Sequence, residues 1–162
     1  MKYLAAVQGD PSSDHAFNFL LTLVKPETDE VYLLSVAEEA PMYAAGPYVN
    51  IEQVVAINLG LQDHLRNVVR GYGKQLTEKG IKHVCLLGKG VDSAGKSVCE
   101  EAEFYQVDVI VVGRRKLSGL QRAVSSSTSS YVLHNAHCSV LVVKYEDSKD
   151  EKEKQKAEEV SL

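Results

Sequence analysis

Five short apolar segments of the chain are rich in residues that favour β-strands, and segments with helical periodicity separate them. The predicted strands span residues 3–7, 31–36, 83–87, 107–112 and 139–144. In the fourth segment, Val109 to Val112 are consecutive apolar residues, which is typical of a strand covered by helices on both faces. We therefore expect this strand in the interior of a sheet.

Four helices are expected between these strands. Asp10 and Pro11 are typical of a helix start, and we expect Pro26 to end this helix, whose apolar face is formed by Phe17, Leu20, Leu21 and Val24. A second apolar stripe runs from Leu61 to Leu76 and is closed by Gly80 as a C-cap. The third helix follows Asp92-Ser93, and the fourth begins in the serine run 125–130.

The resulting β-α-β-α-β-α-β-α-β order predicts an α/β fold. It implies a mostly parallel sheet with right-handed crossovers and helices on both faces. Ligands on such sheets bind beyond the carboxyl ends of the strands, where the strand order reverses. Residues 147–162 are rich in Lys and Glu and lack an apolar stripe. We therefore expect one domain over residues 1–146 and a charged, disordered tail over 147–162.

Composition narrows the classes of function. The chain has 162 residues, 44% of them hydrophobic, with a formal net charge of -4, so a broad basic face for duplex nucleic acid is not expected. No apolar run reaches the roughly 18 residues of a membrane span, and no signal peptide pattern is present. The three cysteines are isolated in the sequence, and the histidines lack metal-ligand spacing. We expect a soluble, cytoplasmic protein without a metal site.

The loop after the fourth predicted strand combines features of an anion site. Gly113 is followed by Arg114, Arg115 and Lys116, and six hydroxyl residues at 125–130 come directly before a predicted helix. Cations and a helix N-terminus suit a phosphate group. The alternative is that the hydroxyl groups only cap the helix and the cations are a solvated part of the loop.

This loop resembles the one in the universal stress protein family, which carries Gly-x2-Gly-x9-Gly-Ser/Thr here. Gly113 matches the first glycine and Ser127 the hydroxyl residue, and 136–144 match the family's closing small residue, cysteine and Val-Leu-Val-Val strand. The resemblance extends from about residue 3 to 145. It implies a Rossmann-like, open five-stranded parallel sheet of order 3-2-1-4-5.

The resemblance also implies a nucleotide site in which several residues are altered. Lys116 and Ser126 stand at the second and third glycines, and Gln8 stands where ATP-binding members have an aspartate that receives the adenine. We expect weak or lost ATP binding, with ATP or AMP as the candidate ligand; the alternative is an ATP-binding member with slow ATPase activity. The candidate residues are Val7, Gln8, Val36, Gly113, Arg115, Lys116, Ser126, Ser127 and Thr128.

Residues 90–97 match the P-loop pattern G-x-x-x-x-G-K-S. In the stress-protein topology, however, this loop follows an edge strand, and the fourth strand ends in Gly113 rather than an acidic residue for Mg²⁺. We interpret the match as a helix-capping loop, with P-loop-type nucleotide binding from Gly90 to Ser97 as the minor alternative. No nucleophile elbow or paired carboxylates on one helix face are present, so we expect no catalytic residues.

The last predicted strand is expected at a sheet edge. An apolar, unpaired edge recruits other chains, and family members commonly pair such strands across a two-fold axis. We expect a homodimer through this strand, formed by Val140, Leu141, Val142 and Val143. The favoured function is therefore a dimeric stress-response or regulatory binding module. The alternative is an edge covered by the charged tail.

Overall fold

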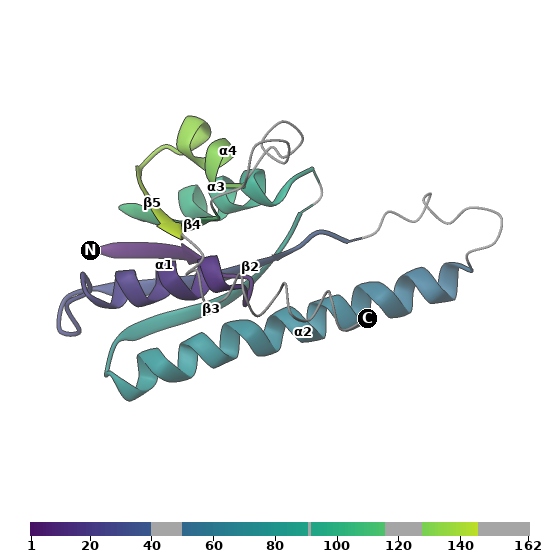
Figure 1. Cartoon of the computed structure of the whole chain (residues 1–162), viewed down its shortest axis with the longest axis horizontal. Coiled ribbons are helices and arrows are strands. Elements are labelled where there is room, and N and C mark those ends of the chain that lie inside the picture. Colours follow the sequence, from purple (N-terminus) through teal and green to yellow (C-terminus); the bar gives the residue numbers. More distant parts are fainter. Residues whose placement is uncertain (40–49, 91, 116–127, 146–162) are drawn as a thin grey trace, which may run out of the picture.

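The computed structural model describes residues 1–39, 50–90, 92–115 and 128–145 (Figure 1). Strands and helices alternate along the chain, as expected. The strands are β1 (Lys2–Ala6), β2 (Glu30–Ala37), β3 (Lys82–Lys89), β4 (Val109–Arg115) and β5 (Ser139–Tyr145). The helices are α1 (Pro11–Leu21), α2 (Ile51–Glu78), α3 (Ala94–Phe104) and α4 (Thr128–Asn135). None of these helices has the length and low charge content that a bilayer span requires.

The five strands form one parallel sheet of order β3-β2-β1-β4-β5, which confirms the expected α/β fold and strand order. β1 is the central strand, and Ala5 is in register with Leu33 of β2 and Val111 of β4. The consecutive apolar residues of β4 place it in the interior of the sheet, between β1 and β5.

Two hydrophobic layers enclose the sheet. On one face, Phe17 of α1 and Tyr72 of α2 belong to the same buried cluster as Tyr3 and Ala5 of β1. On the other face, Leu4 shares a second cluster with residues of α3 and α4, among them Val98, Ala102 and Val132. The alternation along β1 therefore sends neighbouring side chains into opposite layers, and both faces are covered (Figure 1).

Helix α1 begins where the sequence predicts. Asp10 is its N-cap and accepts a 2.8 Å hydrogen bond from the Ser13 amide, with Pro11 in the first turn. The predicted end was wrong, because the helix stops at Leu21 and not at Pro26. The Thr22 hydroxyl donates to the Phe19 carbonyl at 2.7 Å. A local side-chain hydrogen bond thus satisfies a carbonyl of the last turn before the chain reaches Pro26.

Helix α2 begins at Ile51, well before the predicted stripe. A capping box of Asn50 and Gln53 fixes this start. The helix has 28 residues, about 42 Å at 1.5 Å per residue, and its first half extends beyond the sheet (Figure 1). Gly80, with φ +68°, closes the helix as predicted. The three internal glycines, Gly60, Gly71 and Gly73, do not interrupt the helix, and Gly73 lies close to β3.

Candidate functional site

The strand order reverses at β1, which has β2 on one side and β4 on the other. The carboxyl ends of these three strands therefore form the candidate site. The structure brings Val7, Gln8 and Val36 together here, and Gly113 lies in β4 near its carboxyl end. Thr128 is the first residue of α4.

Gln8 is an exposed side chain held by the neighbouring strand. Its Nε2 donates to the Val36 carbonyl at 3.3 Å, and its backbone amide donates to Ser13 Oγ at 3.1 Å. Val7 is buried, donates through its amide to the Leu34 carbonyl at 2.9 Å, and accepts from the Ser35 hydroxyl. The backbone before Gln8 is thus fixed, and the side-chain amide of Gln8 is already hydrogen-bonded to Val36 of β2.

The N-terminus of α1 is occupied by the chain's own carboxylate. Asp10 Oδ2 accepts from the Ser12 hydroxyl at 2.9 Å, in addition to the Ser13 amide on its other oxygen. Gly9 precedes it with φ +76°, a left-handed conformation that favours glycine. The turn after β1 therefore places a negative charge where the helix dipole would favour an anion.

Gly113 is required by packing between β4 and α1. A Cβ atom at this position would lie 2.3 Å from the Ser12 carbonyl oxygen and 3.2 Å from the Ser13 nitrogen. The backbone of the first turn of α1 thus occupies the space that a side chain at Gly113 would fill. From the sequence, Gly113 is expected in an anion-binding loop, and the structure gives it a role in the contact between β4 and α1.

A second carboxylate caps α3. Glu38 Oε1 accepts a 2.9 Å hydrogen bond from the Ala94 amide, and Ser93 Oγ accepts one from the Lys96 amide at 3.2 Å. Glu38 follows the last residue of β2, so it connects the rim of the sheet to the start of α3. Sequence reasoning did not select Glu38, because this contact joins residues 56 positions apart.

The P-loop-like segment is occupied by contacts within the fold. Lys96 Nζ pairs with Asp92 and lies 3.8 Å from Glu100, and these carboxylates raise the pKa of Lys96. A Cβ on Gly95 would be 2.7 Å from Tyr131 Cβ, so this glycine serves the contact between α3 and α4. The segment also follows β3, an edge strand. These contacts support the interpretation as a helix-capping loop.

Part of the predicted site lies outside the described residues. Lys116, Ser126 and Ser127 are not described, and for Arg115 only the backbone at the end of β4 is. The predicted tail, 147–162, is likewise outside them. Among the residues that the structure does describe, no group of three or more His, Cys, Asp or Glu side chains is arranged to hold a metal ion.

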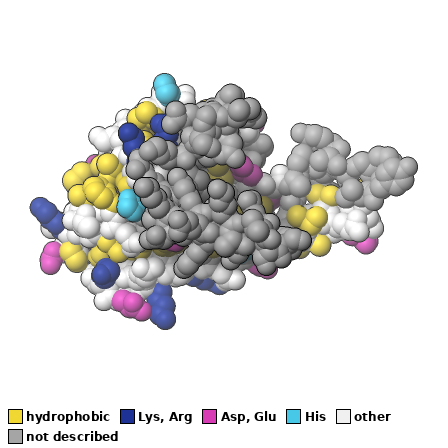
Figure 2. Space-filling model, viewed as in Figure 1, with side chains coloured by type: hydrophobic (Ala, Val, Ile, Leu, Met, Phe, Trp, Pro, Cys, Tyr) yellow, Lys and Arg dark blue, Asp and Glu magenta, His cyan; other side chains and the backbone are white. Residues whose placement is uncertain are grey.

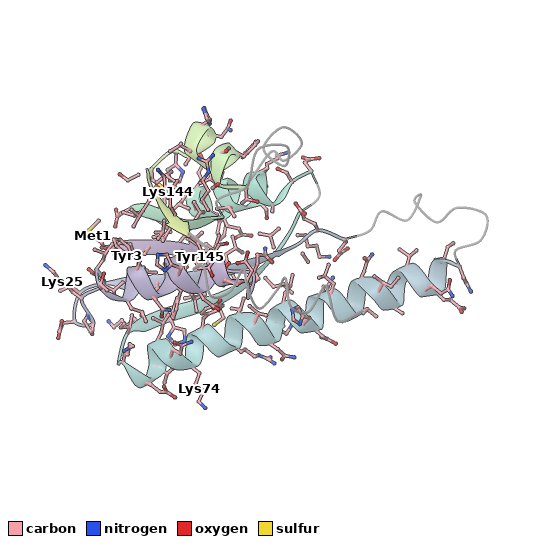
Figure 3. The ribbon with its side chains drawn as sticks, in the orientation of Figure 1. Met1, Tyr3, Lys25, Lys74, Lys144 and Tyr145 are labelled. Carbon is pink, nitrogen blue, oxygen red and sulfur yellow. The ribbon has the colours of Figure 1, made fainter. Side chains whose placement is uncertain are left out.

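Strand β5 is the last strand of the described sheet and pairs with β4 along one side. Its predicted edge residues face opposite layers: Leu141 packs against the cluster of α1 and α2 and Val143 is buried within it, while Val140 and Val142 pack against the other cluster. The strand ends at Tyr145 (Figure 3). The Tyr145 ring centroid lies 5.9 Å from that of His15 in α1.

Comparison with known proteins gives a consistent result. The model of the universal stress protein family matches residues 1–144. The universal stress protein MJ0531 of Methanocaldococcus jannaschii is 28% identical over 146 residues, which cover 88% of this chain and 81% of the relative. YxiE of Bacillus subtilis, also a universal stress protein, is 26% identical over 151 residues and is covered to 98%, against 88% of this chain.

A solved structure reproduces the fold and another contains a nucleotide. The structure of the protein MJ0577 aligns with a TM-score of 0.74 at 21% identity, covering 91% of this chain and 97% of that one. A universal stress protein family protein from Arabidopsis thaliana, At3g01520, was solved with AMP bound and aligns with a TM-score of 0.62 at 19% identity, covering 92% and 94%.

Proposed function

The chain belongs to the universal stress protein family. From this we propose that it is a stress-response or regulatory binding module. In this proposal the protein forms a dimer through β5 and binds ATP weakly or not at all. The observation that carries the proposal is the state of Gln8. The residue is a neutral amide whose Nε2 already donates to the Val36 carbonyl at 3.3 Å. A nucleotide base that uses this edge of the site must compete with that bond, and it meets no carboxylate at Gln8.

The energetic consequence is modest for one bond. A net hydrogen bond contributes about 0.5–1.5 kcal/mol, and one to a charged group about 1.5–3 kcal/mol. Replacing a carboxylate by the neutral amide of Gln8 therefore lowers the affinity for the nucleotide base about tenfold. The altered residues at Lys116 and Ser126 add to this loss at the phosphate end.

The alternative function is an ATP-binding protein with slow ATPase activity. The observation that favours it is the AMP bound to the Arabidopsis protein of the same fold. Arg114, an exposed residue next to Gly113, supplies a cation at the rim of the site. Weak phosphate binding through this loop is compatible with either function.

The experiment that separates the two is acid extraction of the purified protein, followed by chromatography of the released nucleotide. We expect no stoichiometric nucleotide. Equilibrium dialysis with labelled ATP then compares the wild type with Gln8→Asp, which we expect to bind about tenfold more tightly. Arg115→Ala and Lys116→Ala serve as controls for the phosphate end. Stoichiometric nucleotide in the wild type would establish the alternative function.

Dimerisation through β5 is tested by sedimentation. Within the described sheet, β5 pairs only with β4. Its other side would offer backbone donors and acceptors to a second chain, with half-buried Val140, Leu141 and Val142 beside them. Val143 is already buried in the monomer and adds little apolar contact. We expect a species of twice 17.8 kDa at micromolar concentration, with slower exchange of β5 amide hydrogens as concentration rises. A 17.8 kDa species alone would contradict this part of the proposal.

A further inference from the structure

The first part of α2, residues 51–66, carries several large apolar side chains that are exposed; we call it the α2 arm. On this face of the sheet, α2 contributes to the described core from Val68 onward. Before that point, four large apolar side chains are 42–62% exposed: Ile51, Val55, Ile57 and Leu59. Figure 2 shows hydrophobic atoms open to solvent on this part of the molecule. Large apolar side chains gathered on a protruding element mark an interaction surface.

The α2 arm carries charges in a pattern that selects the orientation of a partner helix. Glu52, Leu59 and Arg66 are spaced by seven residues, so they share one helix face within about 20° per heptad. Val55 and Ala56 lie between the first two on the same face, and both are exposed. Asp63, eleven residues after Glu52, lies about 20° from it on this face and pairs with Arg66. The stripe is therefore acidic at its start, apolar in its middle and closed by the Asp63–Arg66 ion pair.

The buried residues of the α2 arm lie on a different face. Val54 and Leu65 are each only 4% exposed, and their spacing of eleven residues is close to three helical turns. At about 100° per residue, this buried face is turned a quarter of a turn or more from the stripe of Glu52, Leu59 and Arg66. The stripe thus remains open while the other side of the helix is covered.

We propose that the α2 arms of two copies of this chain pair in antiparallel orientation, about a two-fold axis at Leu59. This register places Glu52 of each copy opposite Arg66 of the other. It also brings the two Leu59 side chains together, with Ala56 beside them and Val55 facing Asp63 of the other copy. A parallel two-fold pair would instead place Glu52 against Glu52 and Arg66 against Arg66, which is repulsive.

The rest of the chain leaves this face accessible among the described residues. Arg66 Nη1 contacts Asp63 at 2.6 Å, but both side chains are substantially exposed, at 46% and 73%. An exposed pair of this kind contributes little to stability, and a guanidinium has further donors for a second carboxylate. Contact with the sheet-covering cluster begins at Val68, nine residues or about 13 Å beyond Leu59. In an antiparallel pair, the two domains thus lie toward opposite ends.

The contact is small, so the association is expected to be weak and transient. It uses a surface different from the β5 edge, and each of the two surfaces is self-complementary. A chain that used both would form assemblies larger than a dimer. The α2 pairing does not depend on nucleotide binding or on pairing through β5.

The test is a charge exchange between copies. Glu52→Arg and Arg66→Glu are prepared separately, and sedimentation equilibrium is measured for each over a series reaching about 1 mM. We expect each single variant to lose the rise in mass beyond the β5 dimer that the wild type shows at high concentration. An equal mixture of the two variants should recover this rise. One variant then carries arginine at both ends of the stripe and the other carries glutamate at both ends, so each arginine faces a glutamate of the other chain.

Matched controls make the result decisive. Glu78→Arg introduces the same charge change at the other end of α2 and should keep the wild-type rise. Circular dichroism and thermal unfolding show whether each variant folds, and recovery on mixing cannot come from a variant that is merely unfolded. The proposal is overturned if both single variants associate like the wild type, if the mixture does not recover, or if the wild type shows no rise beyond the β5 dimer.

Discussion

Replacing Gly113 with alanine tests whether this glycine is required by packing. The added Cβ would lie 2.3 Å from the Ser12 carbonyl oxygen and 2.7 Å from the Ser12 carbonyl carbon. Favourable carbon contacts occur at about 3.5–4.0 Å, so the first turn of α1 must move by about 1 Å. Both neighbours are backbone atoms, and they cannot rotate away as the end of a flexible side chain can.

The cost follows from the size of that movement. Overpacking a well-packed position costs about 1–3 kcal/mol, and occasionally more, and a backbone clash belongs at the upper end, about 3 kcal/mol. With a urea m-value of about 2 kcal/mol/M, the unfolding midpoint should fall by about 1.5 M. The corresponding fall in Tm is about 6–12 °C. Urea unfolding followed by circular dichroism measures both the midpoint and the slope.

Gly71→Ala is the matched control. Gly71 is an exposed position within α2, and nothing lies within 4 Å of the Cβ that alanine would add there. Alanine is favoured over glycine in a helix by about 0.8–1 kcal/mol, so the same chemical change should stabilise the protein. A Gly113→Ala variant as stable as the wild type would refute the packing explanation and return Gly113 to ligand binding as its only role.

Three further outcomes are expected. The Met1 amino group, followed by backbone and side-chain hydrogen bonds, lowers the pKa of Asp29 to about 2. The contribution of Asp29 to stability is therefore present above about pH 4 and is lost as pH falls toward about 2. In Asp29→Asn, the denaturant midpoint should depend less on pH across that window. Burial, with a hydrogen bond to Asp14, raises the pKa of Tyr72. Tyr72→Phe should therefore lower the free energy of unfolding by about 1 kcal/mol at neutral pH, and the wild type should lose stability above about pH 10. Equal denaturant midpoints for the two proteins at neutral pH would argue against this. Lys96→Ala should leave any Mg²⁺-dependent ATP hydrolysis unchanged, since Lys96 is paired with carboxylates, and abolished turnover would favour the P-loop alternative.

The strands and the start of α1 could be predicted because their signals are local. The apolar run of β4 is buried on both faces, and Asp10 with Pro11 is a cap that depends on adjacent residues only. The end of α1 was missed because Thr22 closes the last turn before Pro26 is reached. The start of α2 was missed because its first turns lie largely outside the core. Few of their residues are buried, so the sequence there lacks a clear apolar periodicity.

The candidate site was predicted only in part, for a similar reason. Gln8 and Val36 follow or end predicted strands, and the topology brings them together. The Glu38 contact with Ala94 joins the end of β2 to the start of α3 and leaves no periodic pattern in the sequence. The role of Gly113 also depends on a contact between β4 and α1 that a loop motif does not reveal.

The carboxylates of Asp10 and Glu38 have a consequence for the charge of any ligand that enters the rim. Each sits on the N-terminus of a helix, α1 or α3, and accepts its amide hydrogens. The positive ends of both helix dipoles are thus already neutralised from within the chain. A molecule with several negative charges is therefore disfavoured beside either helix, and one with few or no charges, such as a nucleoside, meets the smaller electrostatic penalty there.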